Sequence, residues 1–129
     1  MSRQRTIEQA RATAAWNNIQ EVKGQDFEAK YSSWAKKFPA LVLNNGLGQA
    51  LAFLRAKNKD EHQALYSHFS RWVTSQIYRT SDNELLERLI GSHSNSLDYR
   101  HATTETLAFA GWLKRFAEAE LKSEEDQSQ

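Results

Sequence analysis

The side chains that most often perform catalysis or bind metals are sparse in this chain. It contains no cysteine, which excludes disulfides, thiolate zinc sites, iron–sulfur clusters and cysteine nucleophiles. Its four histidines, His62, His68, His93 and His101, do not fall at a metalloprotease spacing. No phosphate-loop or dinucleotide-binding glycine pattern occurs. Only histidine or carboxylate metal sites remain compatible with this composition.

Two short motifs place reactive groups next to each other. Gly91-Ser92-His93-Ser94 puts a hydroxyl beside an imidazole, but neighbours in sequence do not make a triad, and no orienting acid can be identified. A polar loop explains this motif. Glu61-His62 at a predicted helix start is explained as first-turn charge. We therefore predict that the chain is not an enzyme and that it holds no cofactor and no metal.

Cations near the C-terminal end form the most distinctive predicted surface. If the last segment is a helix, one side of it carries Arg100, Thr104, Leu107, Gly111, Lys114 and Arg115. At 1.5 Å per residue, Arg100 and Lys114 lie about 21 Å apart along that side, a span of several phosphates. Gly111 between them would allow close approach of a backbone. An ordinary solvated face is the alternative interpretation.

A second basic cluster consists of Arg55, Lys57 and Lys59. It lies at a predicted helix C-terminus, where cations also complement the helix dipole. Overall, the net charge is +1, but the stretch from Glu118 onward holds five acids and Lys122, so residues 1–117 contain 16 basic and 11 acidic side chains. This mildly basic body with an acidic tail permits an anionic partner without requiring one.

The elements that position these residues are all predicted to be helices. The chain has one proline and five glycines, and no run alternates apolar and polar residues as a half-buried strand does. We expect helices over about 6–23, 26–39, 40–57, 60–78, 81–91 and 97–122. They form one all-α domain over residues 1–122, a compact bundle of five to six helices with a long C-terminal helix. Residues 123–129 are expected to be a disordered acidic tail.

Capping motifs set several of the expected boundaries. Thr6-Ile7-Glu8-Gln9 and Ser81-Asp82-Asn83-Glu84 both match a capping box. Pro39 is expected to end one helix or open the next. The segment 40–57 reads as one buried helix in which Gly46 and Gly48 let a neighbour approach, with a break at Asn44-Asn45 as the alternative.

Helical spacing also predicts which side chains form the core. Trp16 shares one face of the first helix with Ala12, Ala15, Ile19 and Val22. The second helix has an aromatic stripe of Phe27, Tyr31, Trp34 and Phe38, which we interpret as core rather than as a base-stacking platform. Leu43 is assigned to the core face of segment 40–57 with Ala40, Leu47, Leu51 and Leu54. Truncating Trp34 or Leu51 is expected to unfold the domain, at about 2 to 5 kcal/mol.

Targeting signals are not evident in the sequence. No apolar stretch approaches the roughly 20 residues of a membrane span, and the polar N-terminus does not resemble a secretory signal. We therefore expect a cytoplasmic protein.

Several segments, taken in order, resemble one protein family. They are RTIEQARA from Arg5, FPALV from Phe38, NGLGQALAFL from Asn45, Tyr99-Arg100 with Thr104-Glu105, and WLKRFAEA from Trp112. In this order they resemble the small all-helical subunit of the type III-B CRISPR effector, the Cmr complex. The likeness extends over about residues 5–120, and the NGL and WLKRFAEA segments are its most specific parts.

This resemblance implies a non-catalytic structural subunit of an antiviral RNA-guided complex. In that family, several copies stack as a minor filament beside the guide-RNA-binding backbone and help to hold the target RNA, while other subunits cleave. The implied partners are the other effector subunits, copies of the chain itself, and guide and target RNA. Arg100, Lys114 and Arg115 become the best candidates for sequence-independent phosphate contact, followed by Arg55, Lys57 and Lys59.

Two other functions stay open. A helical DNA-binding or regulatory module would insert an exposed helix such as 61–78 into a major groove, with Arg71 as its main feature. A plain protein-interaction bundle would bind no nucleic acid at all.

Overall fold

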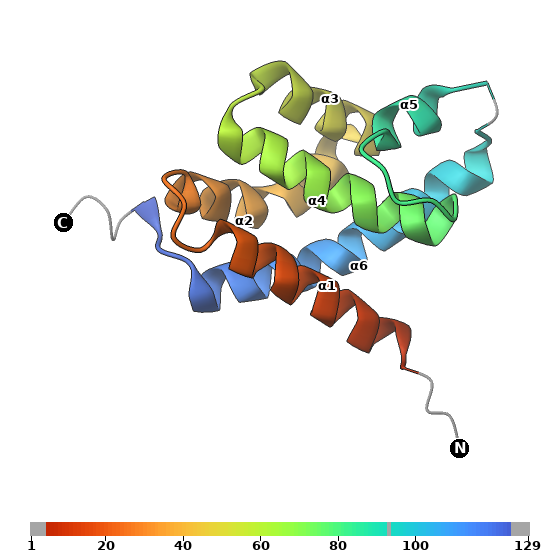
Figure 1. Ribbon diagram of the computed structural model, residues 1–129. Coiled ribbons are helices and arrows are strands. Elements are labelled where there is room, and N and C mark those ends of the chain that lie inside the picture. The colour runs from red at the N-terminus through yellow and green to blue at the C-terminus, as the bar shows by residue number, and fades with distance from the viewer. Residues whose placement is uncertain (1–4, 93, 125–129) are drawn as a thin grey trace.

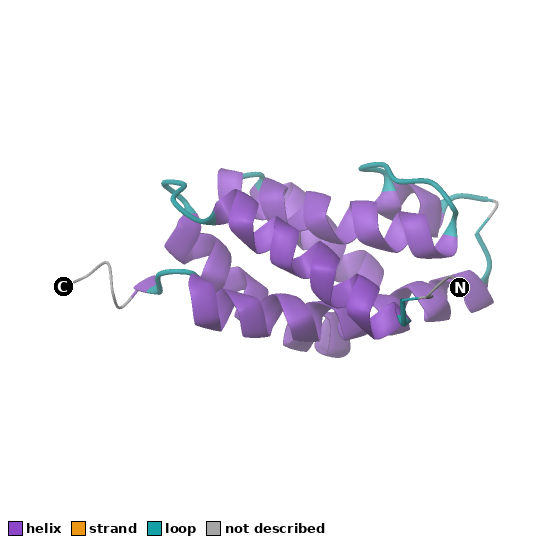
Figure 2. Ribbon diagram, turned by 60° about the horizontal axis from the view of Figure 1, so that its bottom comes forward, coloured by secondary structure: helices purple, strands orange, loops and turns teal. Residues whose placement is uncertain are grey.

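Six α-helices make up the regular structure of the computed structural model, which describes residues 5–92 and 94–124. They are α1 (Ile7–Val22), α2 (Glu28–Asn45), α3 (Leu47–Lys57), α4 (Asp60–Ile77), α5 (Leu85–Ile90) and α6 (Ser96–Glu120) (Figure 1). Within these described ranges there is no strand, and short connections join the helices (Figure 2). The predicted all-α bundle with a long C-terminal helix is confirmed, and α6 has 25 residues.

Only part of the predicted acidic tail lies within the described residues. Of the acidic tail expected at 123–129, residues 125–129 lie outside the described residues, as does His93. No helix in the described part of the chain is both long and apolar enough to span a membrane.

α1 begins as the sequence predicts. The Thr6 hydroxyl accepts a hydrogen bond from the Gln9 N–H at 3.1 Å, and the Gln9 side-chain oxygen accepts one from the Thr6 N–H at 2.9 Å. This reciprocal pair satisfies two backbone donors at the start of the helix. After Val22 the chain turns at Gly24, whose φ of 89° favours glycine.

Pro39 lies inside α2, so the prediction that it ends or opens a helix is wrong. Proline has no N–H to donate and usually breaks a helix interior. Here the helix continues because Phe38, just before the proline, and Val42, three residues after it, are both buried in the core. Tertiary packing therefore outweighs the local preference of proline.

The chain breaks instead at Gly46, whose φ is 89°. The single helix expected over 40–57 is therefore wrong, and the alternative break beside Asn45 is what the structure shows. The close approach expected at Gly48 is confirmed. Its N–H donates to the Tyr99 hydroxyl at 2.7 Å, and an added Cβ would lie 3.1 Å from that oxygen.

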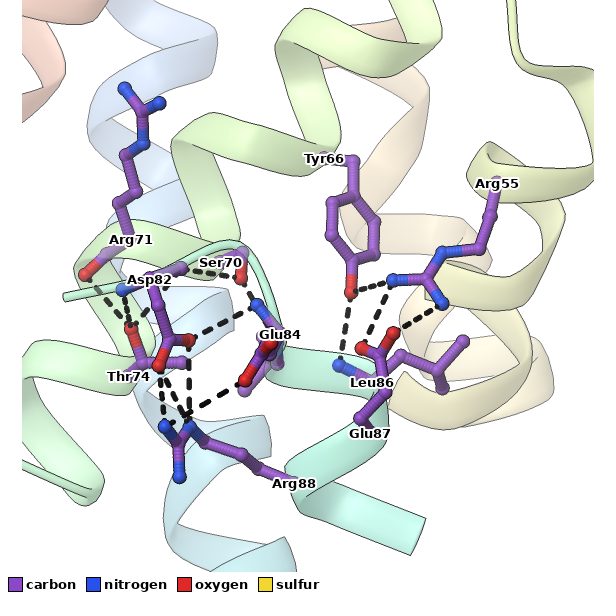
Figure 3. Close-up of polar contacts among 11 residues, drawn as sticks. Arg55, Tyr66, Ser70, Arg71, Thr74, Asp82, Glu84, Leu86, Glu87 and Arg88 are labelled. Carbon is purple, nitrogen blue, oxygen red and sulfur yellow. Dashed lines mark hydrogen bonds and ion pairs between the residues drawn. The ribbon is translucent and has the colours of Figure 1, made fainter. Parts of the chain in front are cut away.

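α5 is capped by side chains of α4. The capping box predicted at 81–84 does not form, because no side chain at the helix start makes the expected bond. Instead, the Ser70 hydroxyl accepts from the Leu85 N–H at 3.0 Å, and the Tyr66 hydroxyl accepts from the Leu86 N–H at 3.0 Å (Figure 3). α4 therefore supplies the acceptors that fix the start of α5.

The centre of the core lies where α2, α4 and α6 meet. The Phe69 ring of α4 has its centroid 4.5 Å from that of Phe38 in α2 and 5.7 Å from that of Phe109 in α6. Trp72, also in α4, stacks on the Phe109 ring with 5.4 Å between the centroids. These rings join three helices into one apolar core.

α1 lies along α6 and runs in the same direction (Figure 1). Arg11 near the start of α1 binds Glu105, and Lys23 just beyond its end binds Glu120. α2 runs the opposite way to α6, because Glu28 at its start accepts a hydrogen bond from the N–H of Lys122. α6 therefore packs against α1, α2 and α4 and presents its remaining side to solvent.

Three residues predicted to be core face solvent instead, and one of them is Ala40. Leu43 is 71% exposed and Trp16 is 41% exposed. In the predicted aromatic stripe of α2, Tyr31 and Phe38 are fully buried, whereas Phe27 and Trp34 are only partly buried against the core. The stripe prediction is confirmed for half of its members. The exposed Trp16 ring lies against Phe116 of α6.

Candidate nucleic-acid interface

Three predicted cations lie together on α6. Arg100, Lys114 and Arg115 are all exposed, and we call them the α6 basic face. Neither Arg100 nor Lys114 has an ion-pair partner among the described residues. Arg115 approaches Glu118 at 3.8 Å, but its side chain is 79% exposed. A surface pair of this kind is weak, so all three charges are available to an anionic ligand.

The space between these cations is open. Gly111 lies on α6 between Arg100 and Lys114, and a Cβ added there would meet no atom within 4 Å. About 21 Å of helix separates the two cations along the axis. This geometry fits an extended polyanion lying along the helix, as the sequence predicts.

Arg55, from the second predicted cluster, is already paired. Its guanidinium binds both oxygens of Glu87, at 2.8 and 3.0 Å, and donates to the Tyr66 hydroxyl at 2.8 Å (Figure 3). The Glu87 carboxylate raises the pKa of Arg55 above its usual value, and Arg55 in turn lowers the pKa of Glu87. The contact joins α3 to α5, so Arg55 has a structural role that the sequence did not reveal.

Lys57 and Lys59 keep their charges free of ion pairs within the described residues. The Lys57 ammonium lies 5.5 Å from the centroid of the Phe53 ring, and Lys59 is exposed just before α4. α3 meets α6 through Gly48, at the opposite end of α3 from Lys57. The second cluster is thus separated from the α6 basic face.

α4 does not have the exposure that a DNA-recognition helix needs. It packs against all five other helices, and half of its residues are buried. Arg71 is exposed and its guanidinium points away from the polar network around Asp82 (Figure 3). A single outward arginine on a central helix does not provide the several base-reading side chains of such a helix.

The histidines of α4 are packed as core residues. His62 is 3% exposed and lies 5.2 Å from Trp34 and 6.4 Å from Phe53, between ring centroids. Burial lowers the pKa of His62 and disfavours its charged form. His68 bonds the Tyr31 hydroxyl at 2.7 Å. In the described residues no three histidine or acidic side chains come together as a metal site requires.

Sequence reasoning missed an aromatic cluster beside the α6 basic face. The Trp16 ring of α1 meets the Phe116 ring of α6 edge-on at 5.3 Å, and Phe116 lies 5.7 Å from Trp112, between ring centroids. In the sequence, Trp112 and Phe116 stand out only as part of the WLKRFAEA segment, and helical spacing predicts Trp16 as core. Its exposure depends on how α1 and α6 dock, which the sequence pattern of α1 alone does not reveal.

Comparisons with known proteins agree on one family. The family model for "CRISPR-associated protein (Cas_Cmr5)" matches residues 7–120. The chain is 35% identical over 115 residues to the CRISPR system Cmr subunit Cmr5 of Thermus thermophilus, covering 89% of this chain and 96% of that protein. It is 26% identical over 125 residues to the Cmr5 subunit of Thermotoga maritima, with coverages of 96% and 92%.

A solved structure shows the same fold. The crystal structure of a CRISPR-associated Cmr5 family protein from Thermus thermophilus matches with a TM-score of 0.78 at 34% identity, covering 92% of this chain and all of that one. The similarity therefore extends over nearly the whole chain, in sequence and in structure.

Proposed function

This chain belongs to the Cmr5 family of CRISPR-associated proteins, and we propose that it acts as the small, non-catalytic subunit of a type III-B Cmr effector in antiviral defence. Its curated relatives are named as subunits of the CRISPR Cmr system, which supports the other Cmr subunits as partners. In this proposal copies of the chain stack beside the guide-binding backbone in the cytoplasm and help to hold target RNA.

The observation that supports RNA contact is the α6 basic face. Arg100, Lys114 and Arg115 are exposed on a helix whose other sides are packed against the bundle. Such cations bind phosphates without reading bases, and in an RNA-guided complex base pairing with the guide reads the sequence. Because the net charge is only +1, one copy binds weakly and several stacked copies supply avidity.

Reversing the charges of the α6 basic face tests this proposal. In the reconstituted effector, Arg100→Glu, Lys114→Glu and Arg115→Glu together are expected to weaken target-RNA binding. Each lost phosphate contact removes about 0.7 from the slope of log K against log salt for a single strand, so the slope should flatten by about 2 units per subunit. The measurement is target affinity at several salt concentrations.

A matched control reverses three other exposed cations, Lys30, Lys37 and Arg79. This variant has the same net charge as the first but keeps the α6 basic face, so its salt slope should stay near that of the wild type. If the two variants behave alike, or if neither changes the slope, Arg100, Lys114 and Arg115 do not contact RNA.

The second cluster is a further proposed contact. Lys57 and Lys59 supply unpaired cations, whereas Arg55 contributes less because Glu87 already neutralises it. The double variant Lys57→Glu, Lys59→Glu in the same salt titration shows whether RNA reaches this end of the molecule.

A further inference from the structure

The aromatic cluster at the seam between α1 and α6 lies beside the α6 basic face. Trp16, Phe116 and Trp112 form a continuous row of ring contacts. Trp16 is 41% exposed, and Trp112 and Phe116 are only partly buried against the core. The bundle therefore leaves aromatic surface uncovered next to Arg115 in α6.

A shallow hollow lies beside these rings. It is lined by Glu8, Ala108, Gly111, Trp112 and Arg115, and we call it the seam hollow. Two of its five lining residues, Gly111 and Ala108, have the smallest side chains, and a Cβ added at Gly111 would meet no atom within 4 Å. Trp112 provides an aromatic wall and Arg115 a cation. The single acid in this lining, Glu8, contacts Arg11 at 2.9 Å and shares that cation with Glu105.

We propose that the seam hollow binds one unpaired nucleobase of single-stranded RNA by stacking against Trp112. Aromatic side chains and an adjacent cationic backbone track are the two components of sequence-tolerant single-strand binding. Arg115 and Lys114 supply the cations, and Gly111 and Ala108 leave room for a flat ring. This inference rests on the proposed function, because the phosphates of the same strand would lie on the α6 basic face.

The charges at the rim favour RNA over an apolar peptide as the occupant. Arg115 lines the hollow and is 79% exposed, and Lys114, the adjacent residue of α6, has no partner in the described part of the chain. A nucleotide matches both features, since its base is flat and aromatic and its phosphate is anionic.

The test compares a strand that has bases with one that lacks them. The full chain is titrated with fluorescently labelled U20 RNA and with an abasic strand of the same length and phosphate charge. One stacked base is worth about 1 to 3 kcal/mol, so U20 should bind at least about 5-fold more tightly than the abasic strand. Cations alone would bind the two strands equally.

Gly111→Leu is the decisive variant because it fills the hollow without removing a packed side chain. No atom obstructs a new Cβ there, and leucine is a better helix former than glycine, so the fold should be kept. We expect it to abolish the preference for U20 while the salt slope stays unchanged. Ala52→Leu, which adds a leucine at an exposed helical site of α3, is the matched control and should keep the preference.

Other results would overturn the inference and can be told apart from failure of the proposed function. Equal wild-type affinities for the two strands exclude base stacking, although charge reversal of the α6 basic face would still weaken both. If the wild-type chain binds neither strand, the inference is also overturned. The phosphate contacts of the α6 basic face are then decided by the charge-reversal test in the reconstituted effector. If Gly111→Leu instead blocks assembly with Cmr subunits and leaves the U20 preference intact, the hollow is a protein contact.

Discussion

Replacing Phe69 with alanine is expected to lower the free energy of unfolding by about 3 to 5 kcal/mol. Phe69 has no exposed surface, and its ring contacts Phe38 and Phe109. Truncation would open a cavity where α2, α4 and α6 meet, and these helices cannot all move inward to fill it. Because the free energy of unfolding of a domain is only about 5 to 15 kcal/mol, this single change removes a large share of the stability.

Urea unfolding followed by circular dichroism measures this loss. Leu43→Ala is the control, since Leu43 is 71% exposed and its truncation should change stability by no more than about 0.5 kcal/mol. Truncating Leu51, which is fully buried, should also lower the free energy of unfolding strongly. Truncating Trp34, which is only partly buried, should lower it by less than the sequence predicts. Equal effects at Phe69 and Leu43 would contradict the assigned core.

Replacing Glu105 with alanine should be almost as damaging, at about 3 kcal/mol. Glu105 is 8% exposed, and its oxygens accept from Arg11 at 2.7 and 2.9 Å and from the Trp72 indole N–H at 2.8 Å. One carboxylate thus joins α6 to α1 and α4. Its removal leaves the Trp72 indole donor without its acceptor and a partly buried guanidinium with Glu8 as its one remaining carboxylate among the described residues.

A double-mutant cycle separates the cost of leaving Arg11 without Glu105 from the value of the pair. Glu105 raises the pKa of Arg11 above its usual value. Arg11 still keeps its charge after the carboxylate is lost, because the ordinary pKa of a guanidinium already lies far above neutral pH. Arg11→Met combined with Glu105→Leu removes both charges and should be clearly less destabilised than Glu105→Ala. If the double variant is the worse of the two in thermal unfolding, the ion pair is not what makes Glu105 important.

Local signals in the sequence predicted local structure well. The Thr6 capping box uses two residues three positions apart, and it forms as expected. The prediction fails where distant residues decide. α2 continues through Pro39 because Phe38 and Val42 hold it in the core. The start of α5 is satisfied by Ser70 and Tyr66, which lie 15 and 20 residues from their donors.

In the candidate site, too, local features are predicted from the sequence and contacts between distant residues are not. The α6 basic face follows from helical spacing on one element, and its residues are exposed as expected. Arg55 pairs with Glu87, 32 residues away, and Arg11 pairs with Glu105, 94 residues away. No local pattern connects such partners. Sequence reasoning therefore could not distinguish Arg55, which is paired, from Arg100, which has no ion-pair partner within 5–92 and 94–124. The seam hollow likewise exists only once α1 has docked on α6.

The most direct test of the proposed function is to tag the chain in its own host, purify it gently, and identify the proteins and RNA that accompany it. We predict recovery of the other Cmr subunits together with a guide-length RNA. We also predict that the variant reversed at Arg100, Lys114 and Arg115 still assembles with these subunits but retains less target RNA. Recovery of a monomer free of CRISPR subunits and RNA would contradict the account.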